Sequence, residues 1–529
     1  MNALAGTGGL IRLALRRDRL LTPLWVIIIG LLPITYVTTF AELYPTAAGR
    51  KGYADINAGI GGLVALYGNL HGSSLGELAA WRAGFTPVII GVIAILMVIR
   101  HTRTEEESGR RELLGATVTG RHAGLAAALL TTGGAMAVMG ALLAGSMASK
   151  GLPAAGSWAF GLEFAAIGWL FAAVGGLAAQ LTSGAGSARG IALAVLGGSF
   201  LLRAVGDLSG GGLSLASPIG WVQRLRPYDR DDFLALWPAV LLTVVLVVAA
   251  VMLSARRDVG AGLLPARLGP AEAAASLRSP LALAWRLHRG LLLGWTVAFV
   301  ITGVLLGGIA KSMMDLLGEN KDLRNIMARM GGQTALIDAY LSSMMGLLGL
   351  IAAAYAIQAT LRLRTEEGAL RAEPVLAAGV GRLRWAGSHL AFSLLGPAAV
   401  LLLAGLSIGL AHGLNTGEPG REALRSMGGA LVQLPAVWVL AGVAVALVGI
   451  LPRLAGASWG ALTFCLLFGL VGAALQLDPW LLDISPFTHL PKLPGGEMTV
   501  APLLWLTAIA LGLVAAGLAG LRRRDIPIL

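Results

Sequence analysis

The chain has 529 residues, 56% of them hydrophobic and only 13% charged, and its formal net charge at pH 7 is +12. Soluble proteins carry about 25% charged residues, so this composition excludes an ordinary soluble enzyme or nucleic-acid-binding protein. Repeated apolar runs of about 20 residues instead predict an all-α polytopic membrane protein. Its positive charge then belongs to arginines at the ends of membrane spans, and no nucleic-acid partner is expected.

Twelve apolar segments are long enough to be membrane spans. They lie near 22–40, 85–101, 123–146, 156–181, 187–206, 236–255, 290–309, 343–361, 386–411, 432–451, 456–476 and 502–521. An even number of spans places both termini on one side of the membrane. Arginines concentrate in segments on that side, as in 256–289 and 522–524, which predicts that both termini are cytoplasmic and that the protein lies in the cell membrane.

A basic amphipathic stretch, GLIRLALRRDRLL (9–21), precedes the first span. Its apolar residues alternate with arginines at helical spacing, which favours a helix lying along the cytoplasmic leaflet among lipid headgroups. The alternative is an arginine-rich flank that only orients the first span. Residues 278–289 repeat the arrangement before the seventh span.

The charged phrase RTEEESGRRE (103–112) lies between the second and third spans. Its arginines are explained by the cytoplasmic location, but its glutamates are not, because acids contribute little to orientation. Glu106 and Arg110 are four residues apart, as are Glu107 and Arg111, a spacing that pairs charges on one helix face. The pattern predicts a short charged helix near 102–118 that is presented to a cytosolic partner. A solvated loop is the alternative.

Other polar features give weaker signals. The outer segments 41–84 and 310–342 are long, and the second contains an amphipathic stretch at 311–332. Glu163 and Arg203 fall within expected spans near their outer ends, close enough to the interface to snorkel, so we expect structural roles for both. Cys465 is the only cysteine, which excludes an intrachain disulfide and a multi-cysteine metal site.

The charged phrase occurs twice, since residues 364–373 read RTEEGALRAE. Residues 103–121 align without gaps on 364–382, with nine of nineteen pairs identical; RRDV (256–259) likewise matches RRDI (523–526), and LALRRDRLLTPLW (13–25) matches LAWRLHRGLLLGW (283–295). This predicts two tandem six-helix repeats of equal topology, 1–262 and 263–529, each with an amphipathic helix and a charged helix. The second charged helix is expected near 362–374, and Pro374 should keep it short.

The candidate docking residues follow from the two charged segments. They are Arg103, Glu105, Glu106, Glu107, Arg110 and Glu112 in the first copy, and Arg364, Glu366, Glu367, Arg371 and Glu373 in the second. No G-x-x-x-x-G-K-[ST] or H-E-x-x-H motif occurs, so we expect no ATPase site, no catalytic residue, no metal site and no cofactor in the chain itself.

Two like halves with two charged helices favour a transporter subunit that is driven by ATPase subunits on separate chains. Two ATPase subunits require two docking points, which gives the duplication a physical cause. The apolar spans suit a small lipophilic or amphiphilic cargo, and membrane lipids are the remaining expected partner. The alternative is a secondary multidrug carrier of the major-facilitator type, against which stand the amphipathic stretches, the long outer segments and the lack of buried acids for proton coupling. A membrane-embedded enzyme is a third interpretation, disfavoured by the absence of a polar catalytic cluster.

The sequence resembles the actinobacterial ABC-2-type permeases of the polyketide-antibiotic exporter family, similar to tetronasin-resistance permeases. The resemblance is carried by RHTRTEEESGRRELLGATVTGRHA (100–123), SPIGW (217–221), SARRDVGAGLLPARLGP (254–270) and LRTEEGALRAEPVLAAGVGR (363–382). It implies that the charged segments are coupling helices, that 9–20 and 278–289 are elbow-like connecting helices, and that the partner is an ATPase dimer holding ATP and Mg. It also implies export of antibiotic or drug-like compounds. Gly368 and Ala369 replace Glu107 and Ser108, which leaves the equivalence of the two docking sites open.

Overall fold

The computed structural model describes residues 3–525, except 116, 259, 265–270, 320–331 and 472–478. Throughout this described part the secondary structure is helical, and the chain divides into two compact units, Met1–Gly269 and Pro270–Leu529. Eleven helices among the described residues are long and apolar enough to cross a membrane. The protein is therefore a polytopic helical membrane protein, as the composition predicts.

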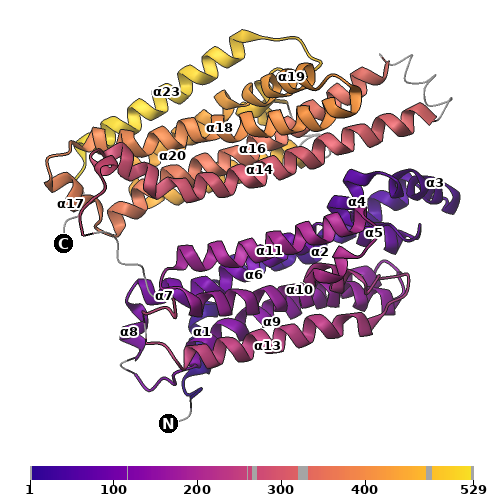
Figure 1. Ribbon diagram of the computed structural model, residues 1–529, viewed down its shortest axis with the longest axis horizontal. Helices are drawn as coiled ribbons and strands as arrows, with labels where there is room; N and C mark the ends of the chain where they lie inside the picture. The colour runs from indigo at the N-terminus through magenta and orange to yellow at the C-terminus, as the bar shows by residue number, and fades with distance from the viewer. Residues whose placement is uncertain are drawn as a thin grey trace. The chain divides into compact units, whose positions relative to one another are not determined.

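The first unit begins with a short amphipathic helix and then alternates long helices with short ones (Figure 1). Its helices are α1 (Thr7–Arg17), α2 (Leu21–Leu43), α3 (Ala47–Ala58), α4 (Gly61–Tyr67), α5 (Leu75–Arg82), α6 (Thr86–His101), α7 (Arg103–Glu107), α8 (Arg110–Gly115), α9 (Ala123–Ala148), α10 (Ala154–Leu181), α11 (Ala185–Leu208), α12 (Pro218–Gln223) and α13 (Trp237–Ser254). Within this unit, α1, α7 and α8 lie at one end and α3, α4 and α5 at the other.

The second unit is built from longer continuous helices. They are α14 (Pro280–Glu319), α16 (Gly332–Gly368), α17 (Ala372–Ala377), α18 (Arg382–Thr416), α19 (Pro419–Leu431), α20 (Leu434–Ile450), α21 (Ser458–Val471), α22 (Pro479–Leu482) and α23 (Val500–Arg523). Helix α17 and the last residues of α23 lie at the same end of this unit (Figure 1).

Each of the twelve expected spans coincides with a helix. The eleventh, 456–476, is represented by α21, and its last residues lie outside the described part of the chain. The outer segment 41–84 folds into α3, α4 and α5, whereas much of the amphipathic stretch 311–332 also lies outside the described residues. The apolar runs therefore locate the membrane helices, although α14 and α16 extend well beyond the expected spans 290–309 and 343–361.

Helix α10 lies at the centre of the first unit, where it contacts α6, α9, α11 and α13. Small residues permit this close packing: Gly140 on α9 and Gly161 on α10 face each other, and a Cβ on either would collide with the carbonyl oxygen of the other. Close backbone approach through small residues is the usual way that helices associate in lipid. In the second unit α18 contacts α14, α16 and α19, while α20 contacts α16 and α23.

The two amphipathic stretches differ in structure. Helix α1 is separate from α2, and it ends at Asp18, whose carboxylate lies 2.8 Å from Arg100 Nη2 and 2.7 Å from His101 Nε2. In the second unit α14 runs without interruption from Pro280, so the expectation of a separate connecting helix at 278–289 is wrong. In the aligned sequence His288 replaces Asp18, and the helix continues through it.

Candidate functional site: two buried arginine–glutamate networks

Each charged segment is divided by a left-handed turn, rather than forming the single short helix that the pattern predicts. In the first copy the turn lies between the short helices α7 and α8. In the second copy it follows the end of the long helix α16 and precedes α17, which contains Pro374. In the first copy Gly109 has a φ of +69° and donates its N–H to the Glu106 carbonyl at 3.1 Å. In the second copy Leu370, at the aligned position, has a φ of +57° and donates to the Glu367 carbonyl at 3.0 Å. A left-handed residue ends the regular helix, because its carbonyl no longer points along the helix axis.

This turn changes the predicted charge pairs. Arg110 does not pair with Glu106 but reaches back to Glu105 at 3.3 Å, and Arg371 likewise reaches Glu366 at 3.4 Å instead of Glu367. The same backbone turn thus produces the same exchange of partners in both copies. The i,i+4 pairs inferred from the sequence are wrong for this reason.

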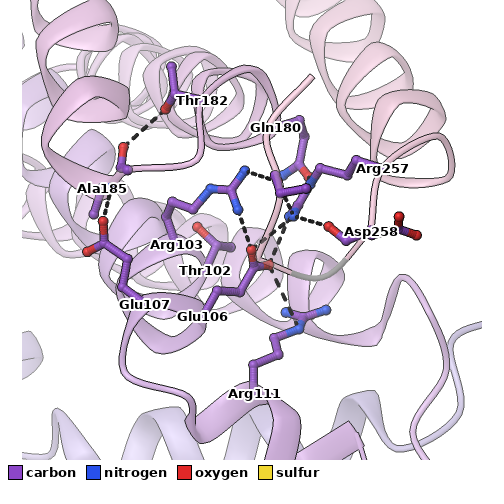
Figure 2. A network of polar contacts seen from close by, with 12 residues as sticks. Thr102, Arg103, Glu106, Glu107, Arg111, Gln180, Thr182, Ala185, Arg257 and Asp258 are labelled. Atoms are coloured by element: carbon purple, nitrogen blue, oxygen red, sulfur yellow. Dashed lines mark hydrogen bonds and ion pairs between the residues drawn. The ribbon is translucent and has the colours of Figure 1, made fainter. Parts of the chain in front are cut away.

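Glu106 is buried at the centre of an ion-pair network that also contains Arg103 and Arg257, called here the first network (Figure 2). Arg103 Nη1 lies 2.5 Å from its carboxylate, and Arg257 donates from both terminal nitrogens, at 2.8 and 2.9 Å. Only 3% of the Glu106 side chain is exposed. Arg257 follows α13, so the network joins the charged segment to the end of the last long helix of its unit.

The second unit contains a matching arrangement of Arg364, Glu367 and Arg524, called the second network. Arg524 Nη2 lies 2.5 and 2.7 Å from the two Glu367 oxygens, and Arg364 lies at 3.5 Å. The Glu367 side chain is fully buried. Arg524 directly follows α23, so this network also joins a charged segment to the last long helix of its unit.

The correspondence extends to a fourth residue in each unit. Arg121 donates to the Arg257 carbonyl at 3.4 Å, and Arg382 donates to the Arg524 carbonyl at 2.7 Å. Arg121 and Arg382 are the last identical pair of the aligned segments. The duplicated sequence therefore encodes a duplicated internal connection between distant parts of each unit.

Sequence reasoning missed Arg257, Arg524, Arg121 and Arg382 as site residues. Their signal was present in the matching RRDV and RRDI stretches and at the end of the nineteen-residue alignment. What the sequence did not disclose is that Arg257 and Arg524 meet the glutamates of the charged segments, 151 residues away in the first unit and 157 in the second.

Glu107 has a role that the second copy lacks. Its Oε1 accepts the backbone N–H of Ala185 at 2.7 Å, at the first residue of α11 (Figure 2). A carboxylate at a helix N-terminus satisfies a free backbone donor and complements the helix dipole. Gly368 occupies the aligned position and provides no carboxylate. With Gly368 in place of Glu107, the second unit thus lacks this helix cap.

The remaining candidates differ in burial: Glu366 is buried, Glu105 is half-buried and the other four are exposed. Glu105 pairs with Arg17 of α1 as well as Arg110, and Glu366 pairs with Arg362 at 2.7 Å. Arg110 and Arg371 expose 56% and 59% of their side chains, and Glu112 and Glu373 are exposed. At aligned positions, each copy therefore presents one exposed arginine and one exposed glutamate beside a buried network, where a partner can reach them.

The left-handed turn allows a direct test of backbone strain. A left-handed L-residue costs about 1–2 kcal/mol, which the greater freedom of glycine in the unfolded chain partly offsets. We expect Leu370→Gly to raise the unfolding temperature of the purified protein modestly. Gly109→Ala should lower it, since a Cβ there meets open space and only the backbone conformation is penalised. Shifts of opposite sign support the shared turn; a stabilising Gly109→Ala contradicts it.

The fold and the paired networks define a class: a multi-pass helical membrane permease whose halves each connect a charged segment to the last helix. Residues 277–522 match the family model for the multidrug efflux system permease Rv1217c, C-terminal domain. The chain is 43% identical over 522 residues to the multidrug efflux system permease protein Rv1217c of Mycobacterium tuberculosis, covering 98% of this chain and 95% of that protein. The chain therefore belongs to the Rv1217c family of efflux permeases.

Proposed function

We propose that the chain is the membrane-spanning subunit of an ABC exporter that moves lipophilic or amphiphilic, drug-like compounds out of the cell. Two copies of a separately encoded ATPase subunit dock on the two charged segments, and ATP and Mg bind to those subunits. The chain itself acts in transport and not in catalysis. Its relative is named as a multidrug efflux system permease, which supports the cargo class.

The duplicated networks carry this proposal. Each network holds an element with exposed Arg110 and Glu112, or Arg371 and Glu373, against the end of the last long helix of the same unit. When a docked subunit displaces the exposed residues, the last long helix of the unit moves with the charged segment. A buried ion pair with several hydrogen bonds resists displacement and so keeps the two together. Two corresponding networks, one in each unit, match the two ATPase subunits of the proposed complex.

In the membrane, the charged segments, α1 and the C-terminus face the cytoplasm, where ATP is available. The excess of arginine in the segments on that side supports this orientation.

The experiment is ATP-driven uptake of ethidium into membrane vesicles that contain the chain with its ATPase partner. Inside-out vesicles should accumulate the dye when ATP is added outside, whereas right-side-out vesicles should not. A partner variant lacking its phosphate-binding lysine is the matched control and should abolish uptake. The purified chain without its partner should hydrolyse no ATP.

Two outcomes oppose the proposal. ATP hydrolysis by the purified chain alone would contradict the division of labour between subunits. Uptake driven by a proton gradient without ATP would favour the secondary carrier.

A further inference from the structure

The first unit contains a cavity of about 480 Å³ at the end away from α7 and α8. Its walls come from the segment between α4 and α5, from α10, and from the segments that follow α11 and α12. A volume of this size falls in the range of sites for drug-sized molecules. None of the charged-segment residues lines it.

Glu163 of α10 lines this cavity and differs from every other acid around it. Only 6% of its surface is exposed, and within the described part of the chain it makes no hydrogen bond or ion pair. A buried carboxylate without a partner is costly, so such a group keeps its proton until a cation lies beside it. The expectation that Glu163 snorkels to the interface is therefore wrong.

Arg203, the other ionisable residue expected near an outer span end, does have a structural role. Its terminal nitrogens donate to the carbonyls of Val64, Ala65 and Leu66 at 2.9 to 3.3 Å and lie 3.4 Å from Asp207. The two terminal nitrogens of Arg203 thus hold the C-terminal end of α4. Arg203 is not available to Glu163.

Each of the other acids that line the cavity has a hydrogen-bond or ion-pair partner. Glu77 accepts the Ser74 N–H at 2.8 Å in a capping box, and Asp229 lies 3.7 Å from Arg226. Asp207 accepts from Ser214 at 2.6 Å besides Arg203. Glu163 is therefore the acid of this lining that has neither a hydrogen bond nor an ion pair among the described residues.

The basic groups that line the cavity do not pair with the Glu163 carboxyl. Burial, with a further contribution from Arg226, lowers the pKa of His71, so its imidazole is neutral at pH 7. Arg224 lines the cavity but is exposed to solvent, where water screens it.

Aromatic side chains form part of the wall. Trp81 and Tyr67 both line the cavity, with ring centroids 5.2 Å apart in an edge-to-face arrangement. The Trp81 indole N–H is already used, since it donates to the Gly68 carbonyl at 2.9 Å. The Tyr67 hydroxyl accepts from Arg82 at 2.6 Å, and this guanidinium lies 4.8 Å from the Tyr67 ring centroid. Trp81 is therefore the ring of the pair that is left to offer an apolar and π contact.

We propose that this cavity binds a lipophilic organic cation, with the positive charge beside Glu163 and the apolar body against Trp81. The inference rests on the proposed export function in so far as it names a class of cargo. The binding itself requires no ATPase. A bound cation stabilises the ionised form of Glu163, whereas an anion or a neutral compound of the same shape does not.

The test measures binding of radiolabelled tetraphenylphosphonium to the full chain in neutral-lipid nanodiscs, with empty nanodiscs as background. Tetraphenylborate, an anion of nearly identical shape, is measured in separate samples. The wild-type protein should bind the cation saturably and the anion not at all. Glu163→Gln should weaken cation binding by about tenfold or more, as expected when one partner of a buried charge pair is removed.

Two further variants complete the design. Glu163→Asp keeps the charge and should retain part of the affinity, and Glu42→Gln changes an exposed acid on α2 outside the cavity and should bind as the wild type does. Glu163→Gln should unfold at the same or a higher temperature, because it replaces an unpaired buried carboxyl by a neutral amide of the same size, so weakened binding cannot be ascribed to misfolding.

The outcomes separate this inference from the proposed function. Saturable binding that is unchanged by Glu163→Gln, or the absence of saturable binding, overturns the cation site even if the complex with its ATPase exports ethidium. Binding that depends on Glu163 supports the site even if ATP-driven export fails.

Discussion

A Glu106→Ala variant is expected to lose about 3–5 kcal/mol of stability, because it leaves Arg103 and Arg257 buried without a counter-charge. The loss should appear as a large fall in unfolding temperature of the detergent-purified protein. It should also appear as loss of ATP-driven uptake, since the charged segment is no longer held against the end of α13. Glu367→Ala should have the same effect through Arg524 and the end of α23.

A matched control is available in each unit. Glu112→Ala and Glu373→Ala remove exposed acids of the same segments and should change stability by no more than about 0.5 kcal/mol. A variant that replaces Glu106, Arg103 and Arg257 together by apolar residues of similar size should recover much of the stability lost by Glu106→Ala, because no buried charge is then left unpaired. Wild-type stability of Glu106→Ala would contradict the role assigned to the first network.

The helical architecture could be predicted from the sequence because lipid imposes strong rules. A chain in lipid must satisfy its own backbone hydrogen bonds, so each apolar run of about 20 residues becomes a helix. The duplication was visible for a different reason: the two units need the same contacts, and the nineteen-residue alignment from Arg103 and Arg364 preserves the residues that make them.

The partners of the glutamates could not be predicted, because they lie far away in sequence. Spacing within the charged phrase suggested local pairs on one helix face, yet Glu106 pairs with Arg257 and Glu367 with Arg524. Local spacing describes an exposed helix, whereas a buried carboxylate takes the strongest hydrogen-bond donors within reach, wherever the fold places them. The separate helix expected at 278–289 is likewise absent, because α14 runs unbroken through His288, the position aligned with Asp18.

The burial of these glutamates changes which residues serve a docking partner. Charge reversal at Glu106 or Glu367 would break a network inside one unit and would say little about an external contact. We therefore propose that surface recognition falls instead to the exposed residues of the same segments, Arg110 and Glu112 in one copy and Arg371 and Glu373 in the other. Internal connection and external docking are thus assigned to different side chains on one short element.

The double variant Glu112→Lys and Glu373→Lys is therefore expected to lose ATP-driven uptake by about tenfold or more, while its unfolding temperature stays close to that of the wild type. Both substitutions lie at exposed positions. Reversing a charge at an interface opposes the complementary charges of the partner, which weakens association without disturbing the fold. Co-purification of the ATPase subunits should fall in parallel, and insertion into the membrane should be unchanged.

Single variants then measure whether the two docking points are equivalent. Glu112→Lys and Glu373→Lys should each reduce uptake, and unequal losses would follow from the cap that Glu107 provides in the first copy only. Glu42→Lys and Glu497→Lys reverse exposed acids elsewhere in each unit and serve as controls. Full uptake and full ATPase co-purification by the double variant would contradict a docking role for Glu112 and Glu373, the exposed acids that the two aligned phrases share.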